Sequence, residues 1–175
     1  NWLLELFGFP VLEGGGIMVS GGSMANLTGI LIARNQLLQD DRERRLNARI
    51  YYSDQTHYSV DRAIKVLGFF PEQICRLPCD ENFQIDCDAL KAQIEQDERD
   101  GLLPFCVIAN AGTTNTGTVD DLPTIAAICR EKGMWMHVDA AYGGGSILCE
   151  KGKKALKGID EANSITVDPH KWFYQ

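Results

Sequence analysis

Short apolar runs alternate along this chain with longer stretches whose apolar residues recur at helical spacing. The apolar runs predict five β-strands, at residues 49–53, 73–77, 105–109, 134–138 and 164–167. Several runs are almost continuously apolar, which is typical of strands that helices cover on both faces. The pattern therefore favours a sheet buried in the middle of the molecule.

The segments between these runs predict helices at residues 23–39, 86–97 and 122–131. In the first of them, Met24, Leu27, Leu31 and Leu38 fall near one helical face, which we expect to be the buried one. Alternating strands and helices indicate parallel strands joined by crossover helices. The predicted fold class is α/β, with a mostly parallel sheet and helices on both of its faces.

Chemically reactive residues follow the predicted strands. In parallel sheets, ligands bind beyond the carboxyl ends of the strands. There we expect five segments to meet, at Ser23, at Asp54 and His57, at residues 112–114, at Asp139, and at residues 168–171.

Length, net charge and cysteine spacing limit the classes of protein to which this chain can belong. The 175 residues suffice for one domain with a real core, and 45% are hydrophobic. The net charge of −7 argues against a nucleic-acid partner, and no apolar run is long enough to span a membrane. The six cysteines form no CxxC pair, so a reduced cytoplasmic protein is favoured over a disulfide-bonded secreted one. The histidine and cysteine spacings match no compact zinc pattern, and we predict no metal site.

Gly21 and Gly22 precede the first long predicted helix. Glycine lets the backbone approach a ligand closely, and a helix N-terminus attracts phosphate. The alternative is an ordinary helix start with Ser23 as the N-cap.

Two charged residues at strand ends are candidates for chemistry. Asp139 ends an apolar strand, where a carboxylate is costly unless paired, and it could pair with a protonated ring nitrogen such as that of pyridoxal phosphate. Lys171 precedes Trp172, Phe173 and Tyr174, and such an apolar setting would lower the pKa of its amine and make it nucleophilic. A capping aspartate and a surface lysine are the simpler alternatives. His137 lies inside a strand, and we interpret it as structural.

The motifs together resemble the pyridoxal-phosphate-dependent decarboxylases, the group that includes aromatic-amino-acid, glutamate and diaminobutyrate decarboxylases. The resemblance extends over essentially the whole chain. It rests on residues 14–16, 20–26, 53–57, 112–114, 137–143 and 169–172, in that order.

This resemblance implies a role for each matching residue. Lys171 would hold pyridoxal 5'-phosphate as a Schiff base, and Asp139 would pair with the pyridine nitrogen. Gly22 and Ser23 would bind the phosphate, with His170 beside it and beside the Schiff base. His57 would stack on the ring, while Thr114 and Ala141 would contact the ring and its substituents. Some relatives have Asn where this chain has Asp168, and a carboxylate there would repel a phosphate.

The resemblance also implies a fold and an activity. The fold would be the large domain of a fold-type-I enzyme, of which residues 1–175 are a part without the N-terminal segment and the C-terminal small domain. The activity would be decarboxylation of an L-amino acid to an amine and CO2 by a full-length homodimer, and the isolated segment would be inactive. The alternatives are an aminotransferase or lyase on the same fold, or a non-catalytic nucleotide-binding module. Against the nucleotide-binding module, the chain lacks the G-x-G-x-x-G loop that such a module would need.

Overall fold

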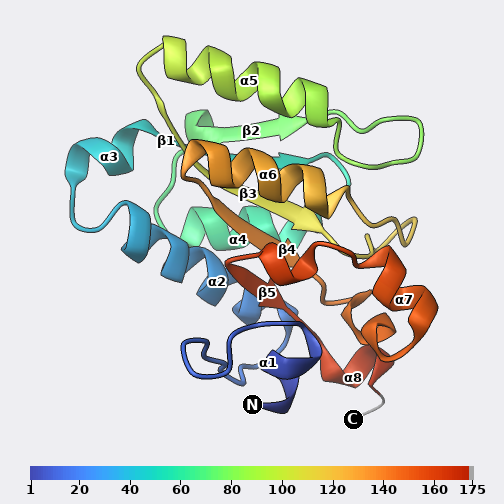
Figure 1. Cartoon of the computed structure of the whole chain (residues 1–175). Helices are drawn as coiled ribbons and strands as arrows, with labels where there is room; N and C mark the ends of the chain where they lie inside the picture. The colour runs from blue at the N-terminus through green and yellow to red at the C-terminus, as the bar shows by residue number, and fades with distance from the viewer. Residues whose placement is uncertain (174–175) are drawn as a thin grey trace.

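A five-stranded parallel sheet forms the centre of the molecule (Figure 1). A computed structural model describes residues 1–173. The strand order is β2-β1-β3-β4-β5, and every neighbouring pair is parallel. The strands are β1 (Ala48–Ser53), β2 (Ile74–Leu77), β3 (Leu103–Asn110), β4 (Trp135–Asp139) and β5 (Ser164–Thr166). The five predicted strands are thus confirmed, with bounds that shift by at most about two residues.

Helices cover both faces of the sheet, which confirms the predicted fold class. On one face lie α2 (Gly22–Leu37) and α4 (Tyr58–Val66), and on the other lie α5 (Cys87–Arg99) and α6 (Leu122–Lys132) (Figure 1). Shorter helices are α1 (Trp2–Leu6), α3 (Arg42–Asn47), α7 (Glu150–Ala155) and α8 (Pro169–Trp172). Short 3-10 helices lie at Pro71–Gln73, Gly144–Leu148 and Ile159–Glu161.

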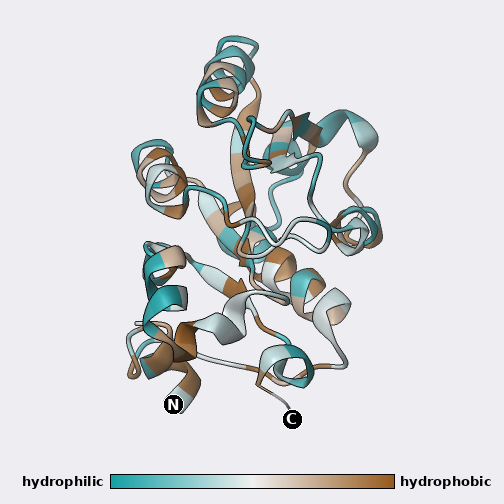
Figure 2. Cartoon of the chain, turned by 90° about the vertical axis from the view of Figure 1, so that its right-hand side faces the viewer, coloured by the Kyte–Doolittle hydropathy of each residue, from teal (hydrophilic) through white to brown (hydrophobic). Residues whose placement is uncertain are grey.

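Alternate strand residues point into two separate hydrophobic cores. Tyr51, Val107 and Met136 face α5 and α6, whereas Ile50 and Ile108 face α2 and α4. Figure 2 shows helices along which apolar and polar residues alternate. Because side chains on a strand alternate, a strand buried on both faces must be apolar throughout, which explains the continuous runs in the sequence.

The predicted buried face of α2 is confirmed only in part. Leu38, just after the helix, is fully buried and Leu27 packs against the same core, whereas Met24 is 42% exposed. The buried residues within the helix are Asn26, Gly29, Ile30 and Ala33. The helix packs on α4 and against β4 and β5, where small and polar residues fit. The alternative in which Ser23 is the N-cap does not hold, because the N-cap is Gly21, with a φ of 87°, and Ser23 lies inside the first turn.

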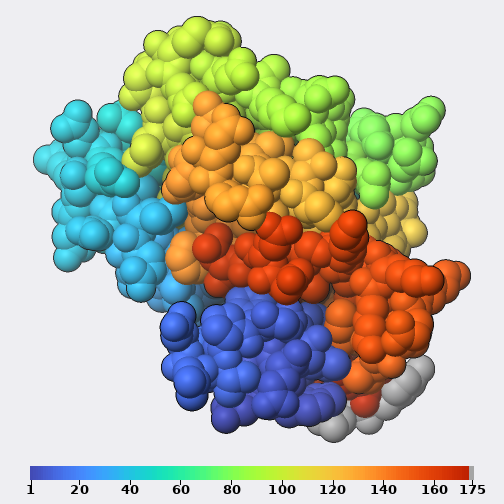
Figure 3. Space-filling model, in the orientation of Figure 1, coloured from blue at the N-terminus to red at the C-terminus, as the bar shows by residue number. Residues whose placement is uncertain are grey.

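The first and last segments of the described chain lie side by side. Figure 3 shows the N-terminal residues against the C-terminal elements, and the rings of Trp2 and Phe173 pack edge to face at 6.2 Å. All six cysteines lie within the described residues and are free thiols. Among residues 1–173, no helix has both the length and the apolar character needed to cross a membrane.

Candidate functional site

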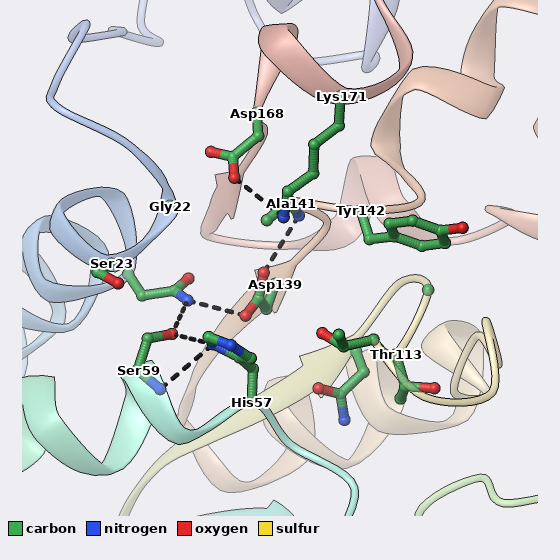
Figure 4. Close-up of a pocket in the computed structure, with 14 residues that line it drawn as sticks. Gly22, Ser23, His57, Ser59, Thr113, Asp139, Ala141, Tyr142, Asp168 and Lys171 are labelled. Atoms are coloured by element: carbon green, nitrogen blue, oxygen red, sulfur yellow. Dashed lines mark hydrogen bonds and ion pairs between the residues drawn. The ribbon is translucent and has the colours of Figure 1, made fainter.

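A pocket lies at the carboxyl ends of four of the strands. Its walls come from the start of α2 and from the segments that follow β1, β3, β4 and β5 (Figure 4). The lining residues are Gly22, Ser23, Asn26, His57, Ser59, Asn110, Gly112, Thr113, Thr114, Asp139, Ala141, Tyr142, Asp168 and Lys171. The predicted convergence of five segments is therefore confirmed. It follows from the parallel topology, which places the ends of all strands at one edge.

The structure brings together most of the predicted site residues. Seven line the pocket: Gly22, Ser23, His57, Thr114, Asp139, Ala141 and Lys171. His170 does not line it, and its side chain is 60% exposed, with Nε2 3.8 Å from Asp168 Oδ2. Asp54 also lies outside the pocket, where it accepts a hydrogen bond from Gln55. The roles that the resemblance gives these residues stay predictions.

The N-terminus of α2 opens into the pocket. No side chain caps this 16-residue helix. The N–H of Met24 donates to the carbonyl of Gly21, and the N–H groups of Gly22 and Ser23 before it are available to a ligand. Glycine at position 22 lets the start of α2 approach Asp168 closely, because a Cβ there would lie 2.8 Å from Asp168 Oδ2. This helix end is therefore built for an anion, and at present the carboxylate of Asp168 lies beside it.

Asp139 supplies a buried carboxylate to the pocket. It is only 8% exposed and accepts hydrogen bonds from Asn26 Nδ2 at 2.8 Å and from the Ala141 backbone N–H at 3.1 Å. No lysine, arginine or histidine of the described chain forms an ion pair with it. A buried carboxylate without a cation suits a ligand that carries a positive charge.

Lys171 lies in a more polar setting than the sequence predicted. Its Nζ is 3.1 Å from Asp168 Oδ2, and its side chain is 36% exposed. The expectation of an apolar, desolvated amine is wrong for the described residues, because α8 turns Lys171 toward the buried carboxylate of Asp168, three positions before it. Tyr174, which formed part of that expectation, lies outside the described residues.

The first residues of α4 fix the ring of His57. It is the N-cap of α4, and its Nδ1 accepts a hydrogen bond from the backbone N–H of Ser59 at 3.3 Å. The Ser59 hydroxyl lies 2.8 Å from the same nitrogen. Both contacts leave Nε2 as the free end of the ring.

His137 is structural, as predicted from its place inside a strand. It is fully buried, and its ring nitrogens contact Asn26 Oδ1 at 3.0 Å and Ser164 Oγ at 2.8 Å. Burial lowers the pKa of this imidazole, and the nearby Asp139 carboxylate only partly opposes that effect.

A second polar cluster forms the wall at the end of β3. Asn110 Nδ2 donates to Ser53 Oγ at 3.2 Å, to Thr56 Oγ1 at 3.1 Å and to Asp120 Oδ2 at 3.0 Å. Burial raises the pKa of Asp120, although hydrogen bonds from the backbone N–H groups of Asn110 and Ile85 act in the opposite direction. These bonds fix the Asn110 side chain at the pocket.

Sequence reasoning missed four of the lining residues: Asn26, Ser59, Asn110 and Tyr142 as individual contributors. Asn26 carried a detectable signal, because it is a polar residue that lies three positions after Ser23, on the same side of the helix. Ser59 and Asn110 carried none, since serine near a helix start and asparagine at a strand end are common in any fold.

Pyridoxal phosphate fits this set of residues. The open N-terminus of α2 suits its phosphate, the unpaired carboxylate of Asp139 suits its protonated ring nitrogen, and the amine of Lys171 suits its aldehyde. Residues 1–173 contain no cluster of three or more histidine, cysteine or acidic side chains that could hold a metal ion.

Comparison with known proteins gives consistent matches. The family model described as the pyridoxal-dependent decarboxylase conserved domain matches residues 1–174. The chain is 54% identical over 175 residues to an aromatic-L-amino-acid decarboxylase of Bacillus atrophaeus. All of the chain is covered, but only 36% of that relative.

Solved structures agree with the sequence matches. The glutamate decarboxylase domain of a diaminobutyrate-pyruvate transaminase and L-2,4-diaminobutyrate decarboxylase from Vibrio parahaemolyticus superimposes with a TM-score of 0.93 at 34% identity, covering 100% of this chain and 40% of that one. The Oryza sativa TDC, solved with PLP and tryptamine, gives 0.88 at 29% identity over 98% of this chain and 40% of that one. The chain thus spans well under half the length of these relatives.

Proposed function

The chain belongs to the pyridoxal-dependent decarboxylase family, and we propose that residues 1–175 are part of the cofactor-binding large domain of an enzyme that decarboxylates an L-amino acid. The observation that carries this proposal is the composition of the pocket. An open helix N-terminus, a buried carboxylate without a cation and a lysine amine lie around one cavity. Structural packing alone does not require this combination.

Each of these groups has a proposed task toward the cofactor. Gly22 and Ser23 bind the phosphate with the N–H groups of the first turn of α2, and Lys171 is the site of covalent attachment. Asp139 holds the positive charge of the ring nitrogen. Ala141, next to that carboxylate, leaves room for the ring, while Thr114 and His57 border it from the two neighbouring segments. We also propose that His170 lies beside the phosphate of the bound cofactor, although its side chain is exposed in the described chain.

When bound, pyridoxal phosphate supplies an electron sink for the charge that develops when the substrate loses CO2. The residues of the chain then control where charges and protons lie. Asp139 stabilises the protonated ring nitrogen, which makes the sink effective. Lys171 would hold the aldehyde of the cofactor through its amine, and Asp168, whose Oδ2 lies 3.1 Å from Nζ, would stabilise the ammonium form of that amine when it is not attached. His57 presents its Nε2 edge to the substrate side of the pocket.

We further propose an aromatic L-amino acid as the substrate, because the relative with 54% identity is an aromatic-L-amino-acid decarboxylase. Tyr142 supports this choice, since it lines the pocket and packs edge to face on Trp172 at 5.6 Å, and both rings are partly exposed. We propose that the full-length protein is a cytoplasmic homodimer, in keeping with the resemblance of its motifs.

The test uses the full-length gene product supplied with pyridoxal phosphate. It is incubated with a panel of L-amino acids, and the products are identified by mass spectrometry together with CO2 release. The proposal expects an amine and CO2, with an aromatic substrate turned over fastest. A keto acid without CO2 would assign an aminotransferase reaction instead. An amine formed fastest from glutamate or diaminobutyrate would overturn the aromatic substrate and leave the reaction standing.

A further inference from the structure

Asn26 occupies the centre of a hydrogen-bond network that joins three parts of the site. It is 1% exposed and lies in the second turn of α2. Its Nδ2 contacts Asp139 Oδ2 at 2.8 Å and Ser59 Oγ at 3.3 Å, while its Oδ1 contacts His137 Nε2 at 3.0 Å. His137 and Asp139 are two residues apart on β4, so both point to the α2 face of the sheet and the amide bridges them.

The orientation of this amide is determined by its neighbours. A carboxylate oxygen can only accept, so the atom facing Asp139 must be the nitrogen, and the oxygen then faces His137. His137 Nε2 must therefore carry a hydrogen. On the other side of the ring, Ser164 Oγ accepts from Trp135 Nε1 at 2.8 Å and is left to donate to His137 Nδ1. The buried imidazole thereby holds the amide in one of its two orientations.

The same network continues to His57 through one hydroxyl. Because Ser59 Oγ accepts from Asn26 Nδ2, its own hydrogen is free to donate to His57 Nδ1. The backbone N–H of Ser59 donates to the same nitrogen, so the proton of the His57 ring belongs on Nε2. His57 therefore presents a donor to the pocket rather than a lone pair.

We propose that Asn26 is a positioning residue that fixes the Asp139 carboxylate toward the cofactor's ring nitrogen and, through Ser59 Oγ, adds a second donor to His57 Nδ1, which reinforces the ring proton on Nε2. The inference rests on the proposed function, since it concerns the residues assigned there to the cofactor. It adds Asn26, whose side chain acts through Asp139 and Ser59. One amide thus links the Asp139 carboxylate with the ring of His57.

The experiment compares four forms of the full-length protein: wild type, Asn26→Asp, Ser59→Ala and Asn35→Asp. Asn35→Asp is the matched control, because it makes the same change on an exposed position of the same helix. Three quantities are measured: the dissociation constant of pyridoxal phosphate, the pH at which the absorbance of the bound cofactor changes, and kcat and KM per bound cofactor. Thermal unfolding of the cofactor-free proteins identifies any variant that fails to fold.

Asn26→Asp replaces a donor by a second carboxylate beside Asp139. Loss of a hydrogen bond to a charged group is expected to weaken cofactor binding by about tenfold or more, and to lower kcat by a similar factor with KM within about threefold. The pH at which the absorbance of the bound cofactor changes is expected to shift in Asn26→Asp, but not in Ser59→Ala or Asn35→Asp. Ser59→Ala keeps the cofactor affinity and the transition but lowers kcat by about three- to tenfold, because His57 loses its hydroxyl donor.

The outcomes separate the inference from the proposed function. If wild type does not bind pyridoxal phosphate, the proposed function fails. If wild type binds it and Asn26→Asp matches Asn35→Asp in affinity, transition and kcat, Asn26 has no positioning role. Should Asn26→Asp not fold, Asn26→Ser removes the same bridge with a smaller polar side chain and is judged by the same three quantities.

Discussion

Asp168 places a carboxylate where the resemblance puts a phosphate. It is 6% exposed, it lies against Gly22 at the start of α2, and it pairs with Lys171. Two negative groups at one helix end repel each other, so Asp168→Asn should strengthen binding of pyridoxal phosphate. We expect a gain on the order of tenfold, which corresponds to about 1.4 kcal/mol. The measurement is the dissociation constant of pyridoxal phosphate, obtained by equilibrium titration of the full-length apoenzyme in wild-type and Asp168→Asn forms.

Pyridoxal without phosphate is the control ligand for this prediction. The Asp168→Asn change also removes the partner of Lys171, and that effect is common to both ligands. The ratio of the two affinities therefore isolates the phosphate. An equal change for both ligands would mean that Asp168 acts only through Lys171.

Asp139 is the residue whose charge the proposed reaction needs most. Asp139→Asn keeps the size of the side chain and its place among Asn26 and Ala141, but it removes the negative charge. We expect kcat to fall by a factor on the order of 10², or about 2.7 kcal/mol of barrier. Steady-state kinetics, normalised to bound cofactor, provide the measurement. Turnover near that of wild type would remove Asp139 from the mechanism.

At the scale of elements, α2 approaches β4 closely because glycine stands at position 29. A Cβ at this position would lie 2.5 Å from Cε1 of His137. Gly29→Ala should therefore destabilise the protein by about 1–3 kcal/mol, although alanine normally favours a helix over glycine. Asn35→Ala, on the exposed side of the same helix, is the control and should be neutral or slightly stabilising. Urea unfolding of the full-length protein compares the two, and equal stabilities would contradict the close contact.

The buried His137 on β4 should make stability depend on pH. Burial lowers its pKa in the folded state below the value of about 6.5 in an unfolded chain. Below pH 6.5 the unfolded state therefore binds a proton that the native imidazole does not. The free energy of unfolding should fall as the pH decreases from 6.5 toward the lowered pKa, by up to about 1.4 kcal/mol per pH unit. His137→Gln should show a shallower slope in this range, and identical slopes would refute the effect.

The sequence predicted the strands better than the contacts between elements. A continuous apolar run indicates a buried strand by itself, so all five strands were found within about two residues. The burial of Asn26 and Gly29 on α2 could not be predicted, because it comes from their fit to His137 and Asp139, which are over a hundred positions away. In the same way, motifs placed Asp139 and Lys171 at the pocket, but only the fold shows that Asp168 lies between Lys171 and Gly22.

At the scale of the whole molecule, the described chain buries two hydrophobic cores but leaves several large apolar side chains exposed. The two cores lie between the sheet and its helices, whereas Leu12, Ile17 and Met18 near the N-terminus are 70–99% exposed. Large exposed apolar side chains of this kind mark surfaces that another part of a protein covers. The relatives are much longer than this chain, since it spans 36% of one and 40% of another. If the full-length protein is as long as these relatives, we expect its other regions to cover these side chains.

Residues 1–175 produced alone should therefore behave as a folded but incomplete unit. We expect a cooperative urea transition, because both faces of the sheet are covered, together with stronger binding of a hydrophobic dye per residue than in the full-length protein. We expect no amine from any L-amino acid, since the proposed homodimer would complete the site with residues outside this segment. Turnover by the segment at the rate of the full-length enzyme would show that the described pocket is sufficient. Ile17→Lys and Met18→Lys should reduce dye binding if these side chains form the exposed surface.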